Sequence, residues 1–387
     1  MANRSIRFIQ AFRGIAALLV VLWHASNFVS PYGTGMGTML FRSGAVMGVD
    51  LFFLISGFIM VYTTANNDGS PRYAWAFFIK RVTRIWPVWI VALAVYVIAQ
   101  WDASYLTQAP KLRWLAHSFF FIPTAGVGGD FAPAFGFPVL GVGWTLNYEM
   151  YFYTFFAVCL LFGRWRWLAL LAWLVFTLVG IPFVTGRLGA IDGWQALLSP
   201  NTDYHYHPRY ISLMTNPLIL MFAAGALIAR LYQSRFIVES RFYLHLAMFL
   251  SLGLVVWQYM YPLRTDHGVL QWGLTLIPLM VVFCIASKSI EIPAPGWLVY
   301  LGDISFSLYL LHGTVQELMG RLAVSTQLSQ AATGYSAMLL STVVSIAAAS
   351  VSHRYIERGL CEYLKRISLN LLVFRNPFRR PMASVST

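Results

Sequence analysis

Apolar runs about as long as a membrane is thick recur from one end of this 387-residue chain to the other. Each is close to the ~20 residues that a helix needs to cross ~30 Å of hydrocarbon. Ten segments are therefore predicted to be spanning helices, at about 8–29, 44–65, 85–101, 142–163, 165–184, 211–232, 242–261, 268–290, 297–319 and 334–355. A shorter apolar run, 112–123, is predicted to be interfacial or re-entrant. The pattern predicts an all-α, polytopic transmembrane helix bundle.

Composition agrees with a surface that faces lipid. Hydrophobic residues make up 58% of the chain and charged residues only 11%, whereas a soluble domain carries about a quarter charged residues. The net charge of +13 could indicate nucleic-acid binding, but the basic residues lie mainly between the apolar segments, where they set membrane topology. We therefore expect the lipid bilayer, and no nucleic acid, as a partner.

Orientation follows from counting Lys and Arg on each side of the predicted spans. With the N-terminus inside, 19 of the 27 fall on the cytoplasmic side, 7 on the other side, and Arg13 lies within the membrane. This asymmetry predicts both termini in the cytoplasm of a multi-pass inner-membrane protein. Arg13 interrupts the first apolar run, which favours a retained helix over a signal peptide. We predict one membrane domain over 1–360 and a basic, disordered cytoplasmic tail over 361–387.

Ionisable side chains inside the spans need an explanation, because each costs roughly 2.5–3.5 kcal/mol or more in hydrocarbon. Arg13 and His24 are eleven residues apart, so a helix puts them on one face, about 16 Å apart along its axis. Snorkelling to the inner surface explains Arg13 but fits His24 less easily. A functional role for the pair is the stronger interpretation.

Depth in the membrane groups further polar residues with His24. Counted along the alternating helices, His24, Asp50, Glu149 and His312 all fall in the outer half of the bilayer. Two imidazoles and two carboxylates in one layer can serve as general acids and bases if their helices are neighbours. The layer does not decide which carboxylate contacts His24.

Two arginines stand at the predicted cytoplasmic mouth of the third span. Arg81 and Arg84 are three residues apart, so a helical turn directs both the same way, and clustered cations suit phosphate groups. A positive-inside membrane anchor explains them equally well on spacing alone.

No metal or tightly bound cofactor is expected. The three cysteines lie far apart without CxxC spacing, and His205 and His207 have no further ligand cluster nearby in the sequence.

Several motifs together resemble the acyltransferase 3 family of membrane O-acyltransferases. The matching stretches are Arg13-x10-His24, GVDLFFLISGF at 48–58, 80–87, WTLNYE at 144–149, ISFSLYLLH at 304–312 and, more weakly, YIER at 355–358. Phe306 stands where many members have tyrosine. The motifs occur in family order over nearly the whole chain, and the second is long and specific.

The resemblance implies acetyl-CoA, or another acyl-CoA, as a cytoplasmic co-substrate and a saccharide acceptor on or near the periplasmic side. It also implies that the positions of Arg13, His24, Arg81, Arg84 and Glu149 are functional. Within the same motifs, His312, Ser307, Tyr309 and Trp144 are candidate supporting residues.

The hypothesis that follows is transfer of an acyl group to a sugar hydroxyl, and the resemblance favours acetyl as that group. Arg13, Arg81 and Arg84 would hold the phosphates of CoA, and His24 would act as general base or as a transient acyl carrier. Asp50 or Glu149 would orient His24, as a carboxylate does in a catalytic triad. The rival functions are a transporter or flippase for a lipid-linked saccharide and a non-catalytic subunit of a polysaccharide assembly machine.

Overall fold

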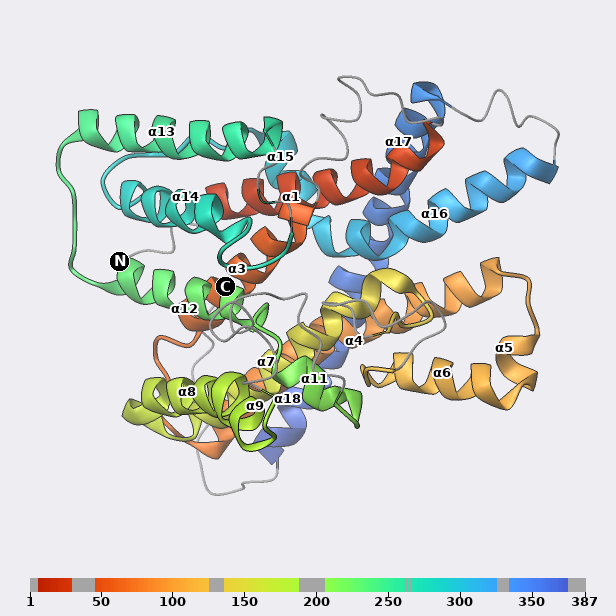
Figure 1. Cartoon of the computed structure of the whole chain (residues 1–387), viewed down its shortest axis with the longest axis horizontal. Coiled ribbons are helices and arrows are strands. Elements are labelled where there is room, and N and C mark those ends of the chain that lie inside the picture. Colours follow the sequence, from red (N-terminus) through yellow and green to blue (C-terminus); the bar gives the residue numbers. More distant parts are fainter. Residues whose placement is uncertain are drawn as a thin grey trace.

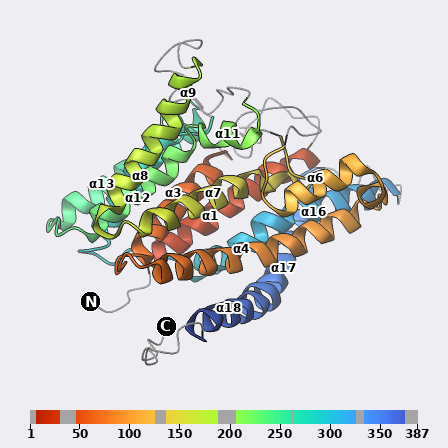
Figure 2. The ribbon, with the colours of Figure 1, turned by 90° about the horizontal axis from the view of Figure 1, so that it is seen from below.

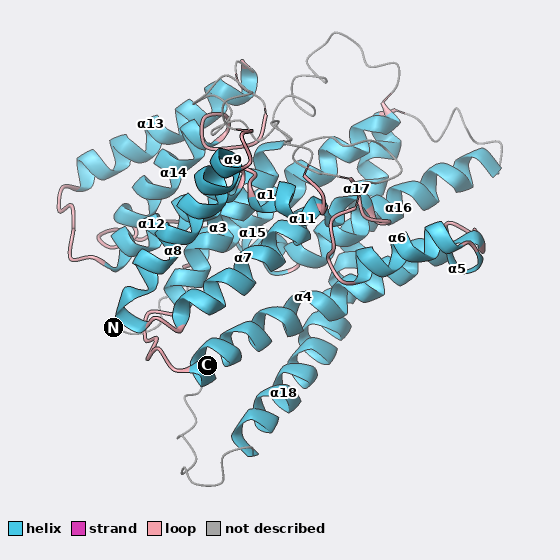
Figure 3. Cartoon of the chain, turned by 60° about the horizontal axis from the view of Figure 1, so that its bottom comes forward, coloured by secondary structure: helices cyan, strands magenta, loops and turns pink. Residues whose placement is uncertain are grey.

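A computed structural model describes residues 6–29, 46–124, 136–187, 206–261, 264, 266–325 and 334–374. Within these ranges the regular elements are helices and none is a strand (Figure 3). The longer helices are α1 (Arg7–Ala25), α3 (Val46–Thr63), α4 (Pro71–Ala99), α7 (Trp144–Leu160), α12 (Ile219–Gln233), α13 (Arg241–Met260), α14 (Gly273–Ala286), α16 (Ser305–Ser325) and α17 (Tyr335–Ser352). The predicted all-α class is confirmed.

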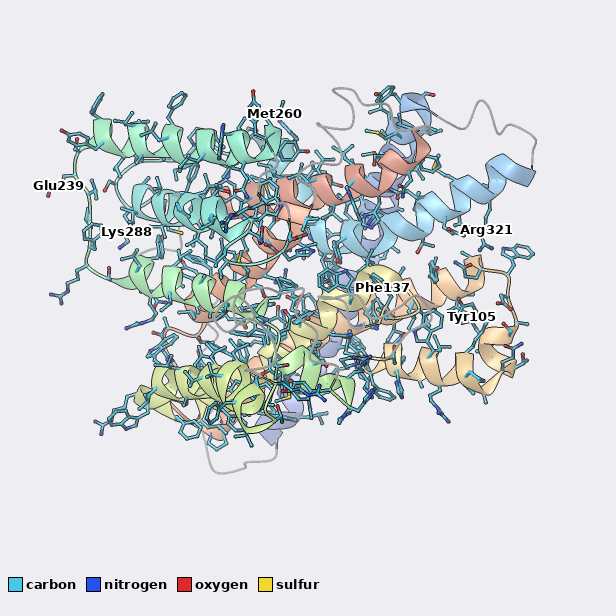
Figure 4. The ribbon with its side chains drawn as sticks, in the orientation of Figure 1. Tyr105, Phe137, Glu239, Met260, Lys288 and Arg321 are labelled. Atoms are coloured by element: carbon cyan, nitrogen blue, oxygen red, sulfur yellow. The ribbon has the colours of Figure 1, made fainter. Side chains whose placement is uncertain are left out.

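Shorter helices connect or extend these elements. They are α5 (Ser104–Thr107), α6 (Ala109–Phe119), α8 (Arg166–Val175), α9 (Ile181–Val184), α11 (Arg209–Met214), α15 (Gly296–Asp303) and α18 (Glu362–Phe374), with 3-10 or π turns at Ser26–Phe28, Gly141–Gly143, Gly163–Trp165, Phe176–Gly180 and His353–Cys361 (η5). In Figure 1, α5 and α6 double back beside the end of α4. On α16, Arg321 points toward that same end of α4 (Figure 4), where it donates a 2.9 Å hydrogen bond to the carbonyl of Gln100.

All ten predicted apolar segments are helical, but not all are long enough to be complete spans. Six helices of the described part are long and apolar enough to cross a membrane, and a seventh counts if α15 and α16 form one broken span. α12 and α14 have only 15 and 14 residues. α12 begins after a turn in which Leu218 N donates to Asn216 Oδ1 at 2.8 Å, and Pro217 lacks an N–H to continue the preceding helix.

The predicted ninth span, 297–319, is broken rather than straight. α15 and α16 meet at an angle of 72°. At the break, Ser305 Oγ donates to the carbonyl of Gly302 at 2.8 Å, so a side-chain hydroxyl satisfies a carbonyl that the helical ladder has released. Beside this bend, Ser305 Oγ accepts a hydrogen bond from Arg13.

Glycines allow the central helices to cross with their backbones in contact. A Cβ at Gly225 of α12 would lie 2.0 Å from the carbonyl oxygen of Leu54 on α3, and one at Gly57 would lie 2.0 Å from that of Phe222. The crossing of α1 and α15 is built in the same way by Gly14 and Gly302. Small residues that let backbones approach closely are typical of helix packing in membranes.

On α13, polar side chains are buried and large apolar side chains are exposed, the reverse of a helix in a soluble protein. The buried side chains of α13 include Ser251 and Gln258, whereas Phe249 is 74% exposed. Large apolar side chains are also exposed on α8 and α17. Contiguous exposed apolar surface of this kind needs a non-aqueous neighbour. Together with the long apolar helices, it identifies a multi-pass membrane protein.

The chain after residue 352 differs from the predicted disordered tail. Residues 353–374 form η5 and α18 as a helical continuation of α17, and the predicted boundary at residue 360 falls inside η5. α18 lies alongside α4 (Figure 2). The segment is ordered because the buried Cys361 of η5 packs against α4 and α18 contacts the same helix, a tertiary contact that the composition of the tail does not reveal. Residues 375–387 lie outside the described part.

Candidate active site

Two histidines meet between α1 and α16. His312 Nε2 lies 3.2 Å from His24 Nδ1, and the ring centroids are 4.8 Å apart. His312 is fully buried and His24 is half-buried. Arg13, on the same helix as His24, also faces α16, where it donates to Ser305 Oγ at 2.9 Å. The predicted common face of Arg13 and His24 is therefore the face against α16.

The hydrogen bonds of this pair determine its tautomers. His24 Nδ1 is 3.0 Å from the carbonyl of Val20, and His312 Nδ1 is 3.1 Å from the carbonyl of Leu308. A carbonyl only accepts hydrogen bonds, so we assign the proton to Nδ1 on both rings. His24 Nδ1–H then donates to both Val20 and His312 Nε2. His24 Nε2 keeps its lone pair and has no hydrogen-bond partner among the described residues.

The partner that orients His24 is thus an imidazole and not a carboxylate. In a Ser-His-Asp triad the third residue holds Nδ1–H and leaves Nε2 as the base. His312 occupies that place here. His24 is consequently set up to accept a proton at Nε2.

Three arginines gather at the other end of the same layer of helices. α4 is capped by Ser70, whose side-chain oxygen accepts a hydrogen bond from Tyr73 N at 3.1 Å. It then presents buried Arg81, which donates to Thr63 Oγ1 at 3.0 Å and lies over the rings of Phe77 and Tyr153. Arg84 is exposed, and its guanidinium makes no hydrogen bond or ion pair with any described residue. Arg13 completes the group from α1.

Glu149 lies between the arginines and the histidines but contacts neither. Its carboxylate accepts hydrogen bonds from Ser56 Oγ, at 3.2 Å, and from Tyr153 OH. Ser56 is on α3, so this network joins α3 to α7. Glu149 is not the partner of His24 in this structure.

Two adjoining cavities connect these groups. The first has a volume of about 560 Å³ and the second about 540 Å³. Both are lined by Gln10, Arg13, Thr63, Arg81, Arg84 and Asp303, so they meet at the arginines. From there the second cavity continues past Ser56, Glu149 and Tyr153 to Phe52, Thr145 and Tyr309.

Tyr309 separates the second cavity from the histidine pair. Its hydroxyl hydrogen-bonds to Thr145 Oγ1 and to the carbonyl of Val142, both at 2.9 Å, and its ring centroid is 6.0 Å from that of His312. Neither His24 nor His312 lines the cavity. The cavity therefore ends one side chain short of the pair.

Asp50 occupies a different site from the one predicted. Fully buried, it accepts hydrogen bonds from His267 Nδ1 at 2.8 Å and from Gly268 N at 2.7 Å. On α3 it shares a face with Leu54 and Gly57, which packs on α12, whereas Gly48 packs on α1. Positions 48 and 50 are about 200° apart around a helix. The prediction grouped Asp50 with His24 by depth, but Asp50 lies on the opposite face of α3, which keeps it from His24.

We expect Asp50→Ala to destabilise the protein, because it leaves the partly buried His267 Nδ1 and the buried Gly268 N–H without an acceptor. Each lost partner costs about 1–3 kcal/mol, so we expect a loss of about 2 kcal/mol or more. Thermal unfolding in detergent measures it. His267→Ala removes only one of the two contacts and serves as the matched comparison. If the Asp50→Ala variant unfolded at the same midpoint as the parent protein, the two hydrogen bonds to Asp50 would not stabilise the fold.

The remaining predicted residues support these groups. Ser307 is buried and hydrogen-bonds to Ser352 Oγ at 2.9 Å and to the carboxylate of Glu357, which joins α16 to η5. Trp144 packs edge-on against His267, with ring centroids 5.4 Å apart. Sequence reasoning missed His267, which follows a loop, and Tyr153, which lies one turn after Glu149 on the same helix face. His205 lies outside the described residues.

A sequence profile described as an acyltransferase domain matches residues 6–352. The chain belongs to the acyltransferase 3 family. The motif resemblance is therefore confirmed, and the arginine group, the cavities and the histidine pair are those of an acyltransferase family member.

Two curated proteins are similar to this chain. The chain is 31% identical over 323 residues to the "Exopolysaccharide production protein ExoZ" of Rhizobium meliloti (strain 1021), covering 80% of this chain and 88% of that one. It is 29% identical over 243 residues to "Nodulation protein 10" of Rhizobium leguminosarum bv. viciae, covering 58% and 59%. No solved structure matches the chain.

Proposed function

We propose that this protein is a bacterial inner-membrane O-acyltransferase. It moves an acyl group, which we take to be acetyl, from cytoplasmic acyl-CoA to a hydroxyl of a cell-surface saccharide or its lipid-linked precursor. One observation carries the proposal: a continuous cavity leads from three guanidinium groups to within one side chain of an imidazole pair, in which His24 Nε2 has no hydrogen-bond partner among the described residues. The exopolysaccharide named in the first relative supports a saccharide acceptor. Membership of an acyltransferase family favours transfer over saccharide transport.

In the proposed arrangement the basic end faces the cytoplasm. Arg13, Arg81 and Arg84 bind the phosphates of CoA, because guanidinium groups form strong charge-assisted hydrogen bonds with phosphate oxygens. The pantetheine arm lies in the second cavity, whose lining is largely apolar beyond Glu149. The thioester then ends beside Tyr309 and Thr145, and Tyr309 must turn aside for the acyl carbon to reach His24.

The chemistry assigned to His24 is general base catalysis. Nε2 takes the proton of the acceptor hydroxyl as its oxygen attacks the thioester carbonyl carbon. The tetrahedral intermediate collapses with cleavage of the C–S bond, and His24 returns the proton to the sulfur, which leaves as the CoA thiol. His312 Nε2 holds the opposite side of the ring through both steps.

An acyl-histidine intermediate is the alternative chemistry for the same residue. It predicts that protein incubated with acetyl-CoA alone carries acetyl on the peptide that contains His24. Direct transfer predicts unmodified protein until an acceptor is present. Mass spectrometry of the digested protein separates the two.

The function is tested by comparing surface polysaccharide with and without the gene. Loss of O-acyl groups from polymer made in normal yield is the expected result. Loss of the polymer itself would instead indicate transport or assembly. The same glycan analysis identifies the acyl group and the sugar that carries it.

Donor binding is tested at Arg84, the arginine of the group that has no described partner. We expect Arg84→Gln to weaken acetyl-CoA binding about 10- to 100-fold, the value of a charge-assisted hydrogen bond, without loss of stability. The measurement is equilibrium binding to purified protein in zwitterionic nanodiscs. Arg72→Gln is the matched control, because Arg72 is exposed on the same helix and lines neither cavity. Equal affinities for the Arg84 variant and the parent would count against the donor site.

A further inference from the structure

Residues that follow the family match form part of the donor cavity. The acyltransferase profile ends at residue 352, yet η5 and α18 contribute Glu357, Arg358, Cys361, Glu362 and Lys365 to the wall of the first cavity. α18 holds this position by lying along α4 (Figure 2). α18 therefore contributes side chains to the first cavity in addition to packing on the outside of the bundle.

The cations of the two cavities fall into two groups by position. Arg13, Arg81 and Arg84 line both cavities and so stand at their junction. Lys80, Arg358 and Lys365 line only the first cavity, beyond the junction. Lys80 comes from α4, Arg358 from η5 and Lys365 from α18, so the outer group is assembled only when α18 is packed against the bundle.

The outer group has charge available for a ligand. Lys80 and Arg358 are exposed and make no hydrogen bond or ion pair within the described ranges. Lys365 is paired with Glu362. The other acids in this cavity are Asp303 and Glu357, and Glu357 already accepts hydrogen bonds from Ser307. Six cations against three carboxylates leave the cavity with an excess of positive charge.

Coenzyme A carries its negative charge in two places that match these two groups. Its diphosphate joins the pantetheine arm to the nucleotide, and its 3′-phosphate lies beyond, on the ribose. A cavity of about 560 Å³ is within the size range of sites that hold small-molecule ligands. If the diphosphate occupies the junction, the 3′-phosphate is directed toward the outer group.

We propose that Lys80, Arg358 and Lys365 bind the 3′-phosphate of the donor, so that the protein uses free acyl-CoA and not an acyl group on the phosphopantetheine of a carrier protein. This inference rests on the proposed function. Phosphopantetheine has no nucleotide and therefore leaves the outer group empty. Lys80 and Arg358 have no partner among the described residues, and Arg358 contributes more than Lys80 because a guanidinium can bind phosphate oxygens through two hydrogen bonds. Lys365 contributes less, because Glu362 already neutralises it.

The test compares three thioesters on purified full-length protein in zwitterionic nanodiscs: acetyl-CoA, acetyl-3′-dephospho-CoA and acetyl-phosphopantetheine. We expect the parent protein to bind acetyl-CoA at least about tenfold more tightly than the dephospho form. Arg358→Gln should remove this preference and leave the affinity for the dephospho form within twofold. Arg366→Gln, which makes the same charge change on α18 outside the cavity lining, should keep the preference.

Each other outcome overturns the inference in a distinguishable way. Equal binding of acetyl-CoA and the dephospho form removes the 3′-phosphate site but leaves the proposed function intact. Absence of binding by any of the three thioesters removes both. An effect of Arg358→Gln that appears only in nanodiscs containing anionic lipid assigns these cations to phospholipid headgroups instead.

Discussion

His24→Ala is expected to lower the rate of acyl transfer about 10²–10⁴-fold, the usual contribution of a general base, while the protein still folds and inserts. The side chain is half-buried, and its described hydrogen bonds are those of Nδ1 with the Val20 carbonyl and with His312 Nε2, so its loss removes little packing. The measurement is transfer of labelled acetyl to surface saccharide in membrane vesicles, normalised to the amount of folded protein. Residual turnover near that of the parent would remove His24 from the reaction.

Variants of the neighbouring histidine test the assigned tautomer. His312→Phe keeps an aromatic ring but removes the Nε2 that accepts His24 Nδ1–H, so we expect a smaller loss than for His24→Ala. The control is His245→Ala on α13, because His245 is exposed and its Nδ1 contacts the carbonyl of Arg241 in its own helix. Its activity should equal that of the parent. A His312→Phe loss as large as that of His24→Ala would give His312 a direct chemical role.

Gly225→Ala is expected to cause a large loss of stability, about 3 kcal/mol or more, because overpacking at a rigid contact forces the backbone to move. The added Cβ would lie 2.0 Å from the carbonyl oxygen of Leu54 and 2.9 Å from Phe58 N. Both neighbours are backbone atoms, so no side chain can rotate away. The α3–α12 crossing must open instead. The unfolding midpoint in detergent and the yield of folded protein measure the effect.

Gly253→Ala provides the control for Gly225→Ala. Gly253 lies within α13, and a Cβ there would meet nothing within 4 Å. Alanine is favoured over glycine inside a helix by about 0.5–1 kcal/mol, so this variant should be as stable as the parent or slightly more stable. A Gly225→Ala protein that unfolds at the same temperature as Gly253→Ala would show that the crossing is not closely packed.

Much of the fold was predictable from hydrophobic run length, because a membrane protein must repeat ~20-residue apolar segments. All ten predicted segments are helical. The bend at Ile304 and the late start of α12 were not predictable in this way. They are accompanied by hydrogen bonds from Ser305 Oγ to the carbonyl of Gly302 and from Leu218 N to Asn216 Oδ1, which the hydrophobicity of a segment does not reveal.

The sequence allowed us to predict which site residues lie at a similar position along their helices, but not which neighbouring helix each of them faces. Counting residues from the ends of the helices placed His24 and His312 in one layer, and the structure brings them together. The same count placed Asp50 in that layer, but it cannot tell which face of α3 points to which neighbour. That depends on Gly57 and Gly225, which set α3 against α12. His267 was not predicted as a site residue, because only the folded chain brings it next to Asp50.

Tyr309, Thr145 and Phe52 close the inner end of the second cavity, and this closure also affects how well the protein insulates the membrane. A cell that stores energy as an ion gradient cannot tolerate a conduit through the same bilayer. A cavity that enters deeply from one side leaves only a few side chains to provide electrical insulation. Two hydrogen bonds hold Tyr309 in place, so in the proposed mechanism the hydroxyl that moves in each catalytic cycle also belongs to the group that keeps the cavity closed to ions.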